Sequence, residues 1–313
     1  MSNPIDVLLL LALPASGKSE VRRYLDHLDP VSALADMALG PTAQLDDYPY
    51  VHLMRRVSTE LRARGEDPVF FESDQSPWLD PMDWLTLIHL INEDFAAMVA
   101  GQTYKPTAPN LLDRFDRART LAGTTAPFEA LDRQTRESVE VEIAGDLTDL
   151  QPIERADPGS TIVIEFARGG PQGADLPLPH PLGYAASIGA LSDEIRSRCS
   201  ILYVWVDPGE SRRRNRDRAL PGKKGDASIL HHGVPEEVMV QNYGTDDMAW
   251  LETEARIPGT IPIGSIDIPM QRFDNRVDRT SFLRTEPETW PTEAVHLLHH
   301  DLSAVLTRLA DHD

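Results

Sequence analysis

The residues best suited to chemistry lie together near the start of the chain. Pro14, Ala15, Ser16, Gly17, Lys18 and Ser19 follow an apolar run, Val7 to Leu13, and precede an amphipathic segment. This order predicts a strand, a tight loop and a helix. The loop fits the pattern G-x-x-x-x-G-K-[ST], with Ala12 in the place of the first glycine. Its backbone N–H groups would turn inward around a phosphate group, because Gly17 adds no Cβ that would intrude.

Two side chains of this loop have distinct tasks in phosphate chemistry. Lys18 would reach the β- and γ-phosphates of a nucleotide, and the Ser19 hydroxyl would bind Mg²⁺. The helix that starts near Gly17 adds unpaired N–H groups and the positive end of its dipole. A chance match in an ordinary strand–helix turn is the alternative. The buried-type strand before the loop and the helix formers after it favour phosphate binding.

The stretch ALPASGKS resembles the GxPGSGKS loops of P-loop NTPases, and within them those of the kinase branch of adenylate, nucleoside and uridine-type kinases. The resemblance is specific over residues 1–50 and absent over 75–158. It implies a three-layer α/β P-loop fold with a mostly parallel sheet, in which Val7–Leu13 is flanked by the strands 161–166 and 200–206. It also implies Mg²⁺·ATP-dependent phosphoryl transfer to a small-molecule acceptor, which the sequence does not name.

Acidic residues end two further predicted strands. Asp46 and Asp47 resemble the Asp pair of uridine-kinase-like enzymes, where one Asp lies close to the acceptor hydroxyl; the alternative is that Asp47 only caps the following helix. Glu165 ends the apolar strand that begins at Thr161. The resemblance places the acid that supports Mg²⁺ there, and it directs Arg168 at substrate or phosphate. The alternative is a structural salt bridge of Glu165 with an arginine.

The third apolar strand, 200–206, leads into a helix rich in arginine, with Arg212, Arg213, Arg214, Arg216 and Arg218. The resemblance places such a helix at the entry to the lid of P-loop kinases, where planar guanidinium groups neutralise the transferring phosphate. Arg212 and Arg216 share one helix face, which we assign to catalysis. Arg214 and Arg218 share another, which we assign to nucleotide binding. The alternative is a solvated basic helix.

Composition limits the remaining function classes. The chain has 313 residues and a formal net charge of −20, so we expect no general binding to nucleic acid or to anionic membranes. The apolar run at the N-terminus is too short to span a bilayer. Cys199 is the only cysteine and allows no intramolecular disulfide, which suits the cytoplasm.

Helical periodicity dominates the middle of the chain, with predicted helices at 80–100, 111–121 and 127–143. We therefore expect a nucleotide-binding core of residues 1–74 and 159–313, and a helical insertion, 75–158, that covers or selects the acceptor. The other expected elements are a helix from Pro49 to 64, strands at 68–72 and 260–268, and helices at 187–198 and 292–310.

Two patterns point to other functions. Asn275-Arg276-Val277-Asp278 resembles the guanine-reading NKxD segment, but the residues before it do not form a clean buried strand, so we expect selectivity for adenine or none. His296, His299 and His300 share a helix face without a metal-binding pattern. A nucleotide hydrolase without an acceptor and a non-catalytic nucleotide-sensing protein remain the alternatives to a kinase.

Overall fold

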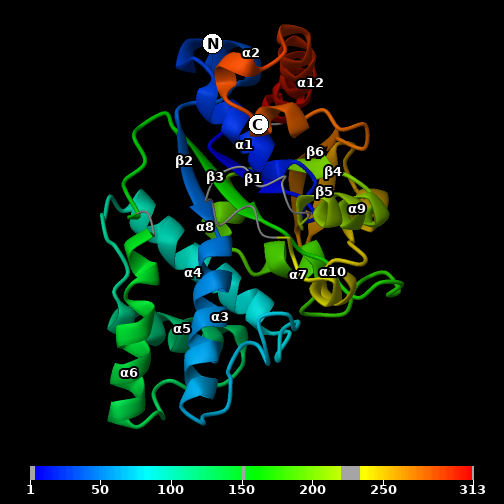
Figure 1. Cartoon of the computed structure of the whole chain (residues 1–313). Coiled ribbons are helices and arrows are strands. Elements are labelled where there is room, and N and C mark those ends of the chain that lie inside the picture. Colours follow the sequence, from blue (N-terminus) through cyan, green and yellow to red (C-terminus); the bar gives the residue numbers. More distant parts are fainter. Residues whose placement is uncertain (1–3, 150–151, 220–232, 312–313) are drawn as a thin grey trace. The chain divides into compact units, whose positions relative to one another are not determined.

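The computed structural model describes residues 4–149, 152–219 and 233–311 (Figure 1). The chain forms two compact units. The first consists of residues 1–44, 157–178 and 193–313, and the second of residues 45–156 and 179–192. The second unit is therefore larger than the expected insertion, because it also takes in residues 45–74 and 179–192, which the sequence had suggested as core.

The first unit is built on a sheet with the strand order β2-β3-β1-β4-β6-β5. The strands are β1 (Val7–Leu11), β2 (Thr42–Asp46), β3 (Thr161–Phe166), β4 (Cys199–Trp205), β5 (Thr260–Ile263) and β6 (Ile266–Asp274). β1 pairs in parallel with β3 and β4, β4 pairs in parallel with β6, and β5 and β6 pair antiparallel. The predicted α/β class, the mostly parallel sheet and the central place of the first strand are confirmed.

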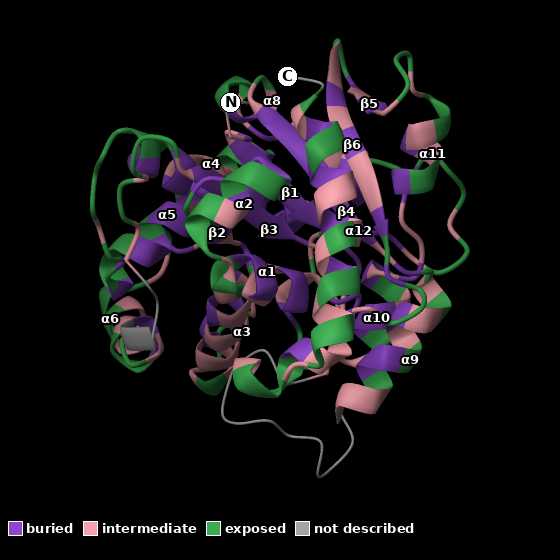
Figure 2. Cartoon of the chain, turned by 90° about the horizontal axis from the view of Figure 1, so that it is seen from above, coloured by how far each residue is buried: buried purple, intermediate pink, exposed green. Residues whose placement is uncertain are grey.

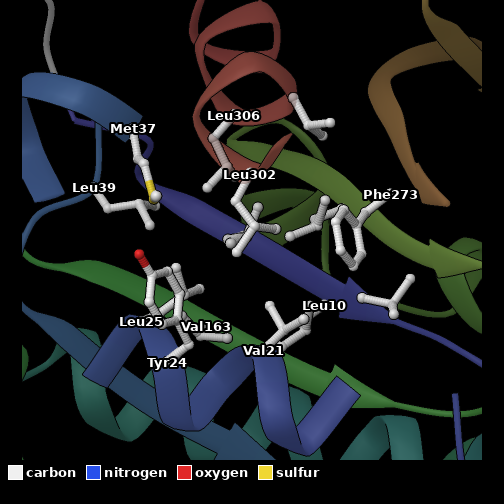
Figure 3. Close-up of a cluster of buried hydrophobic side chains, with 14 of the residues drawn as sticks. Leu10, Val21, Tyr24, Leu25, Met37, Leu39, Val163, Phe273, Leu302 and Leu306 are labelled. Carbon is white, nitrogen blue, oxygen red and sulfur yellow. The ribbon is translucent and has the colours of Figure 1, made fainter. Parts of the chain in front are cut away.

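One face of this sheet is covered by α1 (Lys18–His27), α2 (Pro30–Met37) and α12 (Thr292–Ala310). Figure 3 shows Leu10 of β1 and Val163 of β3 packed with Val21 and Leu25 of α1. The same core includes Leu302 of α12, so three distant segments bury one apolar layer. In Figure 2, β1 is buried along its whole length, as expected for the central strand of a parallel sheet.

Two elements of the first unit differ from the prediction. No helix was predicted directly after Pro30, yet α2 begins there. The Asp29 side chain accepts a hydrogen bond from the N–H group of Ser32 (3.0 Å), and Pro30 takes the first helical position. The single strand expected at 260–268 is wrong. It is a hairpin that turns at Gly264 (φ 59°), and β6 continues to Asp274.

The other helices of the first unit lie between and after these strands. They are α8 (Asp193–Arg196), α9 (Pro208–Ala219), α10 (Glu236–Asn242), α11 (Met248–Thr253) and the 3₁₀ turns η3 (Ser281–Arg284) and η4 (Pro287–Thr289). The continuous helix expected at 187–198 is wrong, because α7 ends at Gly189 and α8 begins only at Asp193.

The second unit is helical, as the periodicity predicted. It contains α3 (Tyr48–Ala63), α4 (Asp83–Val99), α5 (Ala108–Ala122), α6 (Arg133–Ile143), η1 (Asp146–Asp149) and α7 (Gly183–Gly189). None of the helices in the described ranges is both long and apolar enough to cross a membrane.

The strand expected at 68–72 is wrong, and the reason is local. The Ser58 hydroxyl of α3 accepts hydrogen bonds from the N–H groups of Phe70 (3.0 Å) and Phe71 (3.2 Å). The guanidinium of Arg62 donates to the carbonyl groups of Phe71 and Glu72. Side chains thus satisfy the backbone groups that a neighbouring strand would need. Among the described residues, this segment forms one isolated bridge, Phe71 to Trp78.

Candidate functional site

The loop that joins β1 to α1, residues 13–19, has a backbone conformation suited to enclosing an anion. Ala15 (φ 59°) and Gly17 (φ 98°) both adopt left-handed conformations. The N–H group of Ser16 donates to the carbonyl of Leu13 (3.3 Å), which closes a tight turn. A Cβ at Gly17 would collide with the side chains of Thr280 and Asn275, so glycine is required there for two reasons.

The start of α1 leaves backbone donors without acceptors inside the helix. Gly17 is the N-cap and has no side chain to cap the first turn. The N–H groups of Lys18, Ser19 and Glu20 therefore depend on an outside acceptor. Together with the helix dipole, this arrangement favours a negatively charged group in front of the helix.

Two later segments of the first unit fix the 13–19 loop. The Ser211 hydroxyl of α9 donates to the carbonyl of Pro14 (2.6 Å). The Asn275 side chain, which directly follows β6, donates from Nδ2 to the carbonyl of Ser16 (2.7 Å) and to Thr280 Oγ1 (2.9 Å). Its Oδ1 accepts from the N–H group of Arg279 (2.6 Å), and Asn275 is 0% exposed.

Asn275 belongs to this site, although the sequence analysis did not predict it there. The signal was present in the NRVD segment, but the segment was set aside because no buried strand was expected before it. β6 supplies that strand and delivers Asn275 at its carboxyl end, since the N–H group of Asn275 donates to the carbonyl of Trp205 at the end of β4 (2.9 Å).

Lys18 and Glu165 form an ion pair. Lys18 Nζ lies 3.4 Å from Glu165 Oε1, and Arg22 Nη1 lies 3.0 Å from Glu165 Oε2. The Glu165 side chain is only 5% exposed. The salt bridge expected as the alternative for Glu165 is therefore present, and it includes the lysine that was assigned to phosphate. Lys18 can meet a phosphate only by exchanging one anionic partner for another.

The oxygen donors around this pair suit Mg²⁺ in part. The Ser19 hydroxyl, next to Lys18 in the first turn, and the Glu165 carboxylate are oxygen groups of the kind that Mg²⁺ binds. In this structure two cationic side chains face Glu165, which disfavours direct ligation of a third cation. Ser19 and Glu165 are the oxygen donors that would hold such a metal, with Glu165 acting through a water molecule.

Arg168 lies beyond Glu165 on the same strand end and is buried. Its guanidinium carbon lies 4.9 Å from the centre of the Phe166 ring, and Nη1 donates to the carbonyl of Ala167 (2.7 Å). These contacts hold Arg168 against its own segment of the chain.

The arginines of α9 are mostly paired with carboxylates. Arg213 pairs with Glu210 and Asp217, and the exposed Arg216 lies 3.2 Å from Glu236. Arg218 donates to Glu20 of α1 (2.9 Å). The Nη1 atom of Arg212 is buried and has no hydrogen-bond partner among the described residues.

Arg214 was expected to bind nucleotide, but its contacts are with the protein. Its Nη2 donates to the carbonyl of Asn275 (2.7 Å) and its Nε donates to Glu210 (2.7 Å). It is buried, so its guanidinium supports the segment that fixes the 13–19 loop. The expectation that Arg212 and Arg216 act as one face is also weakened, because Arg216 is exposed while Arg212 is half-buried.

Asp46, the last residue of β2, and Asp47 fall in the second unit, which begins at residue 45 within that strand. Asp46 Oδ1 accepts a hydrogen bond from the N–H group of Tyr48 (2.8 Å). Asp47 precedes α3 and is buried, but its side chain makes no capping hydrogen bond. The cap expected as the alternative role of Asp47 is therefore not formed by that side chain, and a role toward an acceptor hydroxyl stays a prediction.

Two lysines and two histidines that follow α9 lie outside the described residues, namely Lys223, Lys224, His231 and His232. Among the residues that are described, no group of three His, Cys, Asp or Glu side chains could hold a metal ion, and His299 instead bonds Tyr24 and Asp36.

Comparisons with models of known protein families, with curated proteins and with solved structures gave no match.

Proposed function

We propose that this protein binds Mg²⁺·ATP at the 13–19 loop and transfers the terminal phosphoryl group to a small acceptor. The observation that carries the proposal is the loop itself. Two left-handed residues and an uncapped helix start lie at the carboxyl end of the central strand of a mostly parallel sheet. Ligands of open α/β sheets bind at that edge. The order of β3, β1 and β4 also agrees with the three-layer P-loop fold that the resemblance implies.

Each side chain of the loop then has a defined task. Lys18 leaves Glu165 and places its charge on the terminal phosphates, while the N–H groups of the first turn hold phosphate oxygens. Ser19 provides a hydroxyl ligand to Mg²⁺, which when bound offsets phosphate charge. Arg22 keeps Glu165 compensated when Lys18 moves, since it contacts the other carboxylate oxygen. Glu165 would orient a water molecule toward the bound metal.

The contacts around Asn275 support ATP over GTP. Guanine reading by an NKxD-type segment needs a carboxylate that is free to accept from the base. Asp278 Oδ1 instead accepts from the N–H group of Ser281 (3.1 Å) in its own turn. Arg276 stacks on Trp205, with its guanidinium carbon 4.0 Å from the ring centre, and pairs with Asp274.

The pairing of the α9 arginines favours a second candidate. Arg213, Arg214 and Arg216 all contact carboxylates. The protein itself thus engages these three arginines. A non-catalytic protein that binds nucleotide and reports its presence would need the loop but not these side chains.

Nucleotide-dependent thermal stabilisation tests the binding step. We expect Mg²⁺·ATP to raise the melting temperature of the wild type and Lys18→Ala to lose most of that shift. Lys105→Ala, a lysine of the second unit, is the matched control and should keep it. An unchanged shift in Lys18→Ala would contradict the assignment of the loop.

Product analysis separates the three activities. ADP formed only when an acceptor is present indicates a kinase, and ADP formed from ATP alone indicates a hydrolase. Stabilisation by ATP without any ADP indicates the nucleotide-sensing protein.

A further inference from the structure

Glu20 is a buried carboxylate in the first turn of α1, two residues after Lys18. Its Oε1 accepts hydrogen bonds from Arg218 Nη2 (2.9 Å) and from Arg284 Nε (2.6 Å). Its Oε2 is also buried, and within the described ranges it has no hydrogen-bond partner. One oxygen thus binds two guanidinium groups while the other binds none.

The charges in this cluster do not balance. Arg218 and Arg284 carry two positive charges against the one negative charge of Glu20. Burial alone would raise the pKa of Glu20, but the charges of Arg218 and Arg284 outweigh it and hold that pKa below its usual value. Burial, assisted by the charge of Arg284, lowers the pKa of Arg218. A net positive charge therefore remains beside a helix start that already favours anions.

Both arginines come from segments that are anchored to the 13–19 loop. Arg218 lies in α9, whose first turn bonds the carbonyl of Pro14 through Ser211. Arg284 lies in η3, which follows the Asn275 segment that bonds the carbonyl of Ser16. Because these anchors fix the two segments, the guanidinium groups are held close to the loop by more than their contact with Glu20.

We propose that Arg218 and Arg284 form a polyphosphate-binding position next to the 13–19 loop, and that the Glu20 carboxylate occupies this position in the ligand-free protein. The inference rests on the proposed function, since it adds residues to the same nucleotide site. A phosphate group offers several oxygens to planar guanidinium donors, whereas Glu20 engages only one. Lys18 is paired in the same way, because the Glu165 carboxylate contacts the ammonium group that would bind phosphate.

Exchange of the carboxylate for an amide tests this competition. Glu20→Gln keeps the shape and an acceptor oxygen but removes the competing charge. Glu20 and Lys18 lie about 3 Å apart along the helix axis. A polyphosphate bound at Lys18 is therefore within one Debye length of the Glu20 carboxylate, about 10 Å at 0.1 M salt. We expect Glu20→Gln to bind Mg²⁺·ATP and inorganic tripolyphosphate about 3- to 10-fold more tightly at low ionic strength, and the gain to shrink in 1 M salt.

A purely structural role of Glu20 predicts the opposite sign, namely lower thermal stability together with weaker binding. The matched control is Glu60→Gln, because Glu60 of the second unit also pairs with two arginines, Arg56 (3.1 Å) and Arg64 (2.8 Å). It should leave both affinities within about twofold, a difference of ~0.4 kcal/mol.

Arg284→Gln gives a second, independent measurement that is needed if Glu20→Gln does not fold. It should weaken binding of both ligands at least threefold, and the double variant should lose the gain of Glu20→Gln. Unchanged or weaker binding in Glu20→Gln, unchanged binding in Arg284→Gln, or a gain confined to ATP would each overturn the proposal. If the wild type binds neither ligand, the proposed function fails as well. If only the Glu20 and Arg284 variants deviate while Lys18→Ala behaves as expected, this inference alone fails.

Discussion

Replacement of Asn275 by alanine should weaken both the fold and the nucleotide site. The change removes three hydrogen bonds of a fully buried side chain, to the carbonyl of Ser16 (2.7 Å), to Thr280 Oγ1 (2.9 Å) and from the N–H group of Arg279 (2.6 Å). A net hydrogen bond contributes about 1 kcal/mol, and a buried group left without a partner costs about 1–3 kcal/mol. Thr280 can rotate to a new partner, so we expect a loss of about 3 kcal/mol in the free energy of unfolding of the first unit.

The effect on the site follows from the group that loses its donor. The carbonyl of Ser16 belongs to the 13–19 loop, directly before Gly17, so its orientation sets the direction of the next N–H group. Without Asn275 the loop samples conformations in which that N–H group no longer faces a phosphate. We expect the dissociation constant for Mg²⁺·ATP to rise at least tenfold, which is about 1.4 kcal/mol.

A matched control separates stability from site geometry. Asn92 of the second unit also ties a loop to its unit through two hydrogen bonds, to the carbonyl of Ala190 and from the N–H group of Ser192, both 2.9 Å. Asn92→Ala should lower the melting temperature but keep the affinity for ATP. Calorimetric titration below the melting temperature of both variants gives the comparison. If Asn275→Ala lost stability yet bound ATP within about twofold of the wild type, the contact with Ser16 would be structural only.

Three other changes have defined outcomes. Arg216→Ala should leave ATP turnover within about twofold (~0.4 kcal/mol in barrier), because Arg216 is exposed and paired with Glu236; a loss of tenfold or more would restore it to the catalytic set. Mg²⁺·GTP should bind no more tightly than Mg²⁺·ATP in competition titrations, because Asp278 is engaged in its own turn; tenfold tighter binding of GTP would contradict this. In Glu210→Gln, the free energy of unfolding should fall less steeply than in the wild type as the pH is lowered. Hydrogen bonds from Arg213 and Arg214 lower the pKa of Glu210 to about 2. Its contribution is therefore complete above the unfolded pKa, near 4.5, and is lost as the pH falls toward 2. If the free energy of unfolding of the variant had the same dependence on acidic pH as that of the wild type, the stabilising role of the Glu210 carboxylate would be refuted.

The sequence predicted those parts of the fold that depend on neighbours along the chain. β1, the 13–19 loop and α1 follow one another directly, so apolar periodicity and the glycine suffice to place them. β6 escaped prediction because Pro262 and Pro269 interrupt the alternation and Gly264 turns the chain between two short strands. Without β6, the position of Asn275 at a strand end could not be recognised.

The partners of the charged residues could not be predicted for a different reason. Arg218 and Glu20 are 198 positions apart, and Arg284 and Glu20 are 264 apart. Spacing along a helix explains which arginines share a face, but it does not reveal which carboxylate the fold brings to that face. The arginine-rich helix was therefore expected to be free for ligand, whereas the fold pairs most of it.

The two contacts of Glu165 decide how the thermal stabilisation experiment with Lys18→Ala can be interpreted. Removal of one partner from a buried ion pair usually destabilises a protein, because it leaves a charge buried without compensation. Here Arg22 remains 3.0 Å from Oε2 when Lys18 is replaced, so Glu165 keeps a cationic partner. Lys18→Ala should therefore fold with a melting temperature close to that of the wild type in the absence of ligand. A loss of ATP-dependent stabilisation in that variant can then be assigned to the missing ammonium group rather than to a collapse of the loop.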